Sequence, residues 1–317
     1  MVNIPLLLMG CGGVGRQLLH HIVSCRHLHS KQGVMLRVVG VCDSKSMVAV
    51  PDVLTSHLDD EFLLKLCKVK SSGSSLQELG NFGGCQVFSG QEIARKVMEF
   101  AATLRKLSGL ALVDCSASSQ TVELLGQAVN LDCCVVLANK KPLTSSLNDY
   151  DKLVSQPRRI RHESTVGAGL PVISSINRIL SSGDPIFRII GSLSGTLGYV
   201  MSEVEGGRPF SEVVNTAKRL GYTEPELRGL IRNIKWDRCH ICSQILEMIS
   251  GMDVARKALI LARLLGCRIN LGSIKLEIYS RCYSEQPLVI QGAGAGNDTT
   301  AAGVLADILD IQDLFRH

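Results

Sequence analysis

The stretch IPLLLMGCGGVG, residues 4–15, decides the fold because it joins an apolar run directly to a glycine-rich loop. The amphipathic segment GRQLLHHIVSCRHL then continues to residue 28. This order predicts a buried strand, a tight turn and a helix. Gly10, Gly12 and Gly15 satisfy G-x-G-x-x-G: the first permits the turn, the second lets the backbone approach a pyrophosphate, and the third allows close packing of helix on strand. The stretch therefore predicts a Rossmann-type dinucleotide-binding domain, with phosphates at the helix N-terminus.

Short apolar runs and amphipathic segments alternate over the next hundred residues. The predicted strands are LRVVGVCD (36–43), LALVDCSA (110–117) and CCVVLANK (133–140), with a predicted helix in QTVELLGQAVNL (120–131). Such alternation is typical of an α/β fold with a parallel sheet and crossover helices. Residues 44–90 give no clear period, and their Ser/Gly-rich part predicts a surface loop.

An acidic residue, Asp43, ends the second predicted strand, 28 residues after Gly15. That spacing exceeds the usual value of about 20 for the acid that binds the ribose hydroxyls of NAD. Ser44 and Lys45 beside it would instead suit a 2′-phosphate, so the residues leave NAD and NADP open. A glycine turn that binds no dinucleotide is the competing interpretation, and the strand–loop–helix context disfavours it.

The composition is that of a globular protein with a substantial core. The 317 residues are 45% hydrophobic and 20% charged, and the formal net charge is +5. No dense Lys/Arg block is present, so we expect no nucleic-acid partner, whereas a mildly positive surface suits a small anionic ligand. The apolar run near residue 4 is about half as long as a membrane span requires. We expect no membrane association, no signal or transit peptide, and a cytoplasmic protein whose twelve cysteines are reduced thiols.

Six further motifs occur in an order that resembles homoserine dehydrogenase, in particular the stand-alone plant proteins that lack a fused aspartate kinase. The resemblance covers most of residues 1–225 and 250–315. The motifs are ANKKPL (138–143), HESTVGAGLP (162–171), GSLSGT (191–196), GYTEPE (221–226), GMDVARK (251–257) and QGAGAGNDTTAAG (291–303).

The resemblance implies an oxidoreductase that interconverts L-homoserine and L-aspartate 4-semialdehyde with NAD(P), in the biosynthesis of threonine, isoleucine and methionine. It implies a Rossmann domain of residues 1–145 plus 286–317. An α+β lobe for substrate binding and dimerisation would span residues 146–285, in a homodimer. The small-molecule substrate would be the only other expected partner.

The same resemblance implies a role for individual residues. Lys257 would be the catalytic acid/base, while Glu224 and Asp253 would bind the amino acid. A monovalent cation, Na⁺ or K⁺, would bind at Glu163, Val166, Ala168 and Leu170. The cofactor would be lined by Cys11, Gly13, Val14, Ser116, Lys140, Gly221 and Gly296, in addition to Gly10, Gly12, Gly15 and Asp43.

The chemistry suits these residues. Reduction of an aldehyde places negative charge on its oxygen, which a cationic lysine stabilises and protonates. A carboxylate such as Glu224 would pair with the substrate ammonium, and the carbonyl groups of GAGLP suit a hard cation. Each residue also has a simpler interpretation: Asp253 and Lys257 could be a solvated pair worth about 0.3–0.5 kcal/mol, and Lys140 a surface residue. Their occurrence together in family order favours the site.

Two departures from the family pattern fall in the second lobe. An atypical insertion occupies about residues 227–249, and a stretch of the lobe is missing at about residues 270–282. The lobe is therefore expected to be truncated, in a region that helps to form the family dimer. The pair Cys239 and Cys242 lies in the insertion without further ligands, so we expect no zinc site.

Two alternative functions follow. Since a displacement of about 1 Å can cost roughly 10²-fold in rate, the departures would fit a catalytically impaired dinucleotide-binding homologue or isoform. A different amino-acid or semialdehyde dehydrogenase is disfavoured by GYTEPE and GMDVARK together.

Overall fold

The computed structural model divides into two compact units, Met1–Ser164 with Thr300–His317, and Thr165–Thr299. Glu224, Gly221, the insertion at 227–249 and nearly all of the stretch at 270–282 lie outside the described residues. The domain boundaries predicted from the sequence stay a prediction. The structure describes residues 1–80, 84–186, 189, 203–204, 206–219, 253, 256–266, 282, 288, 290 and 296–315.

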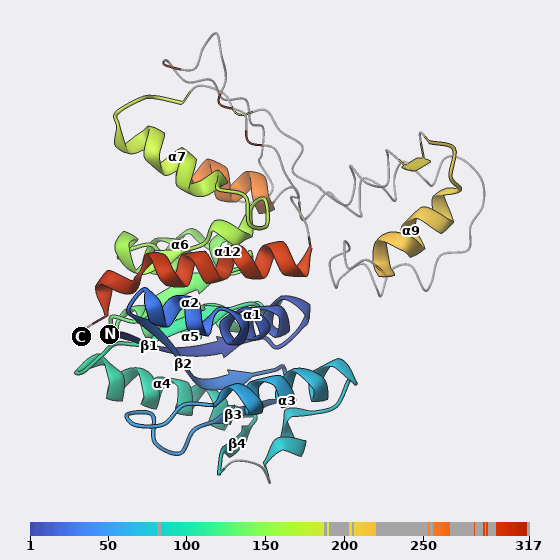
Figure 1. Ribbon diagram of the computed structural model, residues 1–317. Helices are drawn as coiled ribbons and strands as arrows, with labels where there is room; N and C mark the ends of the chain where they lie inside the picture. The colour runs from blue at the N-terminus through green and yellow to red at the C-terminus, as the bar shows by residue number, and fades with distance from the viewer. Residues whose placement is uncertain are drawn as a thin grey trace. The chain divides into compact units, whose positions relative to one another are not determined.

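The first unit is built on a seven-stranded sheet of order β4-β3-β2-β1-β5-β6-β7, with helices around it (Figure 1). The α/β class predicted from the sequence is confirmed. The strands are β1 (Val2–Met9), β2 (Val34–Cys42), β3 (Ser46–Ala49), β4 (Gln86–Ser89), β5 (Ala111–Asp114), β6 (Cys134–Leu137) and β7 (Ile160–Arg161).

The sheet is mixed, whereas the sequence predicted a parallel one. Strands β2, β1, β5, β6 and β7 are parallel, but β3 pairs antiparallel with both β2 and β4. The reason is the tight connection after β2: the chain reverses between Cys42 and Ser46, which is too short for a parallel crossover. β3 and β4 both lie within residues 44–90, where no strand or helix was predicted.

Helices of this unit are amphipathic and cover the sheet. The helix predicted at 15–28 is two helices that meet at Cys25. The first helix ends there, with backbone N–H groups donating to the carbonyl oxygens of His21 and Val23. α1 contacts α3, whereas α5 contacts α4 and α6. The helices are α1 (Gly13–Ser24), α2 (Arg26–Lys31), α3 (Asp60–Ser71), α4 (Gln91–Arg105), α5 (Thr121–Val129) and α6 (Leu147–Leu153), with short 3₁₀ turns at Leu76–Leu79, Pro142–Thr144, Pro157–Arg159, Glu163–Thr165 and Gln312–Leu314.

The central strand β1 is buried on both faces. Leu6, Leu7 and Leu8 are all fully buried, so successive side chains on opposite sides of the strand meet apolar layers. Helix α12 (Asn297–Asp310) comes after the second unit in the sequence, but from Thr300 onward it belongs to the first unit. Its side chains Val304 and Ile308 are fully buried.

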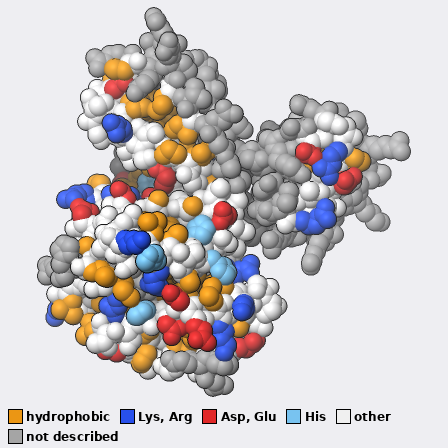
Figure 2. Space-filling view, in the orientation of Figure 1, with side chains coloured by type: hydrophobic (Ala, Val, Ile, Leu, Met, Phe, Trp, Pro, Cys, Tyr) orange, Lys and Arg blue, Asp and Glu red, His pale blue; other side chains and the backbone are white. Residues whose placement is uncertain are grey.

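The second unit is described only in part. It contains α7 (Val172–Ser181), α9 (Phe210–Arg219) and a helical stretch at 256–264. On the face drawn in Figure 2, Lys and Arg side chains of the described residues are interspersed with Asp and Glu.

Candidate functional site

The glycine loop between β1 and α1 has a different requirement at each glycine. Gly10 has a φ of +92°, and a Cβ there would lie 2.5 Å from the backbone nitrogen of Ser116. A Cβ on Gly15 would lie 2.0 Å from the carbonyl oxygen of Gly10. Gly12 is exposed and would meet nothing within 4 Å. The loop is therefore closely packed on its inner side and open at Gly12, where a ligand can approach.

The start of α1 suits an anion. Gly12 is the N-cap and has no side chain to cap the first turn, which also has no acidic residue. The backbone N–H groups of that turn are therefore available to phosphate oxygens, and the helix dipole favours negative charge there. Gly13 and Val14, predicted to line the cofactor, form this turn and are half-buried.

The thiol of Cys11 in the same loop is buried, with 4% of its surface exposed. Burial, together with the nearby Cys67, raises the pKa of Cys11 to about 12. The residue is thus a neutral packing side chain of the loop rather than a reactive thiolate.

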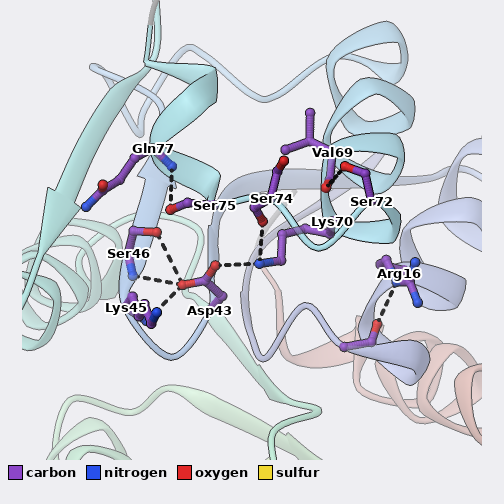
Figure 3. Close-up of polar contacts among 11 residues, drawn as sticks. Arg16, Asp43, Lys45, Ser46, Val69, Lys70, Ser72, Ser74, Ser75 and Gln77 are labelled. Carbon is purple, nitrogen blue, oxygen red and sulfur yellow. Dashed lines mark hydrogen bonds and ion pairs between the residues drawn. The ribbon is translucent and has the colours of Figure 1, made fainter.

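Asp43 lies in the turn after β2 and is held by four donors (Figure 3). Its Oδ1 accepts from the backbone N–H groups of Lys45 and Ser46, each at 2.8 Å, and from the Ser46 hydroxyl at 3.2 Å. Its Oδ2 accepts from Nζ of Lys70 at 2.8 Å. Burial opposes ionisation of Asp43, but the hydrogen bonds from Lys70 and the two N–H groups outweigh it and lower its pKa.

Lys70, which the sequence did not single out, is in the last turn of α3. Its ammonium also donates to the carbonyl of Ser74 at 3.0 Å, and 17% of its side chain is exposed. The signal that could have found it is the acidic start at Asp59 and Asp60, which marks the beginning of a helix that ends near Lys70. The ion pair places a cation where the ribose of a dinucleotide would meet Asp43.

Ser116 and Lys140 follow β5 and β6, the two strands on the other side of β1. The backbone N–H of Ser116 donates to Asp114 at 2.9 Å, and the carbonyl of Lys140 accepts from the Thr144 hydroxyl at 3.0 Å. The structure thus brings the glycine loop, Asp43, Ser116 and Lys140 to the same edge of one sheet, where its parallel strands end. That edge is where ligands bind in open α/β sheets.

The predicted cation ligands divide between the two units. Glu163 lies in the first unit, and its backbone N–H donates to Asp307 of α12 at 2.9 Å. Burial, with a contribution from the Glu163 charge, raises the pKa of Asp307 to about 7.

Val166, Ala168 and Leu170 lie in the second unit, and Ala168 has a φ of +57°. In the part of the chain that the structure describes, no cluster of three or more His, Cys, Asp or Glu side chains could hold a metal. A cation at this loop would depend on carbonyl oxygens instead.

Asp253 and Lys257 form an ion pair in the second unit, with Nζ and Oδ2 2.6 Å apart. Lys257 is only 8% exposed, so the pair is not the solvated pair that the simpler interpretation describes. Gly296, in the same unit, has a φ of +126°, and its carbonyl accepts from the hydroxyl of Thr299 at 3.3 Å. Glu224 and Gly221 lie outside the described residues.

Sequence comparisons point to one family. The family model described as homoserine dehydrogenase matches residues 171–230. A chloroplastic bifunctional aspartokinase/homoserine dehydrogenase 2 of Arabidopsis thaliana is 31% identical over 275 residues, which are 85% of this chain and 26% of that protein. A homoserine dehydrogenase of Emericella nidulans is 28% identical over 269 residues, covering 56% of this chain and 68% of that protein. The chain spans only 29% to 42% of the length of three other bifunctional relatives.

Solved structures of similar fold cover 97% to 99% of this chain. A hyperthermophilic archaeal homoserine dehydrogenase in complex with NADPH has a TM-score of 0.69 at 21% identity, and 99% of each chain is covered. A homoserine dehydrogenase of Thermoplasma acidophilum has a TM-score of 0.67 at 22% identity, covering 97% of this chain and 98% of that one.

No helix among the described residues is long and apolar enough to cross a membrane.

Proposed function

We propose that this chain, a homoserine dehydrogenase-like protein, is an NAD(P)-dependent oxidoreductase that interconverts L-homoserine and L-aspartate 4-semialdehyde. The observation that carries the proposal is the glycine loop, open at Gly12 and packed against Ser116, at the edge of the sheet where β1, β5 and β6 end. The ion pair between the buried Lys257 and Asp253 in the GMDVARK motif supports it. The setting would be the biosynthesis of threonine, isoleucine and methionine.

The reaction divides between the bound cofactor and the chain. The residues at the glycine loop, Asp43, Ser116 and Lys140 would hold NAD(P), which would supply a hydride acceptor for the alcohol carbon of homoserine. As the neutral amine, Lys257 would take the hydroxyl proton in that direction; as the ammonium, it would return the proton to the carbonyl oxygen in reverse, and its positive charge would stabilise the developing negative charge. Asp253, at 2.6 Å, orients the lysine, and with Glu224 it would bind the amino-acid end of the substrate.

The test is the change in NAD(P)H absorbance when purified protein is given homoserine and NAD⁺ or NADP⁺. We expect turnover that falls by about 10²-fold or more in Lys257→Ala, because the general acid/base is lost. Lys31→Ala, in α2 on the first unit, is the matched control and should keep full activity. Retained dinucleotide binding with no turnover in the unsubstituted protein would favour the impaired homologue instead.

The surroundings of Asp43 support NADP as the preferred cofactor. Both carboxylate oxygens already accept hydrogen bonds, and Lys70 neutralises the charge that would repel a 2′-phosphate. Lys45 adds a second cation in the same turn. A carboxylate without a cation beside it would favour the free ribose hydroxyls of NAD. Here at least one lysine ammonium lies close enough to pair with the 2′-phosphate of NADP.

Lys70→Met tests this preference. We expect kcat/KM with NADP⁺ to fall by roughly 10–100-fold, since a hydrogen bond to a charged group is worth about 1.5–3 kcal/mol, while the value with NAD⁺ changes little. Lys68→Met is the matched control, because Lys68 is exposed on the same helix. An equal loss with both cofactors would contradict the assignment.

The remaining expectations are part of the same proposal. We expect a homodimer, which size-exclusion chromatography with light scattering would test. Activation by Na⁺ or K⁺ over a tetraalkylammonium salt at equal ionic strength would test the cation site. A cytoplasmic location stays a prediction.

A further inference from the structure

A fully buried carboxylate, Asp114, ends β5 at the candidate cofactor edge. Its Oδ1 accepts from the backbone N–H of Ser116 at 2.9 Å. Its Oδ2 accepts from the hydroxyl of Thr121 at 2.7 Å and from the side-chain amide of Asn139 at 3.0 Å. Burial of a carboxylate is costly unless donors satisfy it, so these three bonds hold the loop after β5 in one conformation.

Asn139 connects that loop to the one after β6. Only 4% of it is exposed, and its Nδ2 also donates to the carbonyl of Ser118 at 2.7 Å. Its Oδ1 accepts from the backbone N–H of Lys141 at 3.1 Å. One side chain thus fixes the β5 loop and the backbone on either side of Lys140.

The two loops lie beside the glycine loop. The backbone N–H of Cys115 donates to the carbonyl of Met9 at 2.8 Å, and a Cβ on Gly10 would meet the nitrogen of Ser116 at 2.5 Å. Asp43 follows β2, on one side of β1, whereas Asp114 ends β5 and Asn139 follows β6, on the other side. A dinucleotide with its pyrophosphate at the glycine loop and its adenosine ribose at Asp43 therefore has its nicotinamide half over β5 and β6.

We propose that Asp114 and Asn139 are positioning residues that hold the loops carrying Ser116 and Lys140 against the nicotinamide half of the dinucleotide. The inference rests on the proposed function, because it presupposes that the chain binds NAD(P). Neither side chain needs to touch the cofactor: each acts through the backbone and hydroxyl groups that it orients. Binding of the adenosine half, which would lie near the end of β2, should not change when either residue is substituted.

The test compares two ligands in calorimetric titrations of the full chain: NADP⁺, and 2′-phospho-ADP, which lacks the nicotinamide ring and its ribose. We expect Asn139→Ala to weaken NADP⁺ binding about ten-fold, the loss typical of a buried hydrogen bond, and to change the binding of 2′-phospho-ADP by less than about two-fold. In turnover, kcat should fall while KM for homoserine stays within about two-fold, since the amino acid is bound by other residues.

Two further variants separate positioning from a loss of stability. Thr121→Val removes one donor to Asp114 and leaves the Asn139 bridge, so it should fold and show the same selective loss at about two- to three-fold. Ser146→Ala removes the cap of α6, just after these loops, and should lower stability without changing either affinity.

The outcomes are distinct. Equal weakening of both ligands in Asn139→Ala and Thr121→Val, or no weakening of NADP⁺ in folded variants, would overturn the inference. Unsubstituted protein that binds NADP⁺ but does not oxidise homoserine would overturn the proposed reaction alone. Protein that binds neither ligand would overturn both.

Discussion

Gly12, the N-cap of α1, and Gly15, in the first turn of that helix, have different surroundings. Gly12 has room for a side chain and a φ of −82°, which any residue can adopt, whereas a Cβ on Gly15 would lie 2.0 Å from a backbone oxygen. The first glycine is therefore required only by a ligand, and the second by the fold itself.

Alanine at each position should separate the two requirements. We expect Gly12→Ala to unfold within about 2 °C of the unsubstituted protein, because the added methyl meets no neighbour, but to bind dinucleotide at least about ten-fold more weakly. Gly15→Ala should lose about 1–3 kcal/mol or more of stability through overpacking. Thermal unfolding measures the stability of each variant, and calorimetric titration measures its affinity for dinucleotide. Unchanged binding in Gly12→Ala would argue against a pyrophosphate at this loop.

The glycine loop and Asp43 were predicted from local patterns, because each follows an apolar strand. Ser116 and Lys140 were expected from the family resemblance, and the structure brings all of them to one edge of the sheet. Lys70, Asp114 and Asn139 were not predicted, because their roles depend on partners distant in the chain: Lys70 reaches Asp43, and Asn139 reaches Asp114. No spacing rule in the sequence encodes those pairs.

Lys70, which pairs with Asp43, lies in the last turn of helix α3, whereas other residues hold the first turn of that helix. Asp59 caps the helix by accepting from the backbone N–H of Phe62 at 2.8 Å. Asp60 pairs with Arg26 of α2, with Nε 2.7 Å from Oδ1. The helix is therefore anchored at its start by polar contacts, and by Phe62, Leu63 and Leu66 along its buried face.

Removal of the cap should cost stability without changing cofactor choice. We expect Asp59→Ala to lower the free energy of unfolding by about 1 kcal/mol, because one N–H of the first turn loses its acceptor, while Asp59→Ser retains the cap and most of the stability. Urea denaturation gives the stabilities. The ratio of NADP⁺ to NAD⁺ efficiency should match that of the unsubstituted protein, and a shift in it would show that the helix start controls Lys70.

Strands β1, β2, β5 and β6 were predicted within a few residues of their bounds, because long apolar runs define buried parallel strands. Strands β3 and β4 were not predicted. β3 is a short apolar and buried run, SMVA, inside a segment that shows no clear period, and β4 is exposed or half-buried along its whole length and so gives no apolar signal. Their pairing is decided instead by the tight reversal after Asp43.

The first unit is discontinuous in sequence, and α12 completes it from beyond the second. Its side chains Ala301, Val304 and Ile308 are all fully buried, as is Ile311 directly after it. Polar contacts join the same region to β7 and the turn after it: Arg161 pairs with Asp310 at 2.5 Å, and the Ser164 hydroxyl donates to the carbonyl of Thr300 at 2.9 Å.

A charge on the buried face of α12 should therefore unfold the first unit. We expect Ile308→Asp to lose the native circular dichroism signal and dinucleotide binding together, because an unpaired buried charge costs several kcal/mol against a total stability of about 5–15 kcal/mol. Ala306→Asp is the matched control, because Ala306 is exposed on the same helix. Dinucleotide binding that survives in Ile308→Asp would mean that the sheet is stable without this helix.

The return of α12 also sets an order of events during synthesis. A ribosome that has finished β7 must still translate the whole second unit before the helix that covers the sheet exists. At about 5–20 residues per second, that interval is roughly 7–30 s. For that time the nascent sheet presents the apolar surface that Val304 and Ile308 later cover. A chaperone that binds extended apolar surface therefore has its natural substrate here in the translating chain rather than in the finished protein.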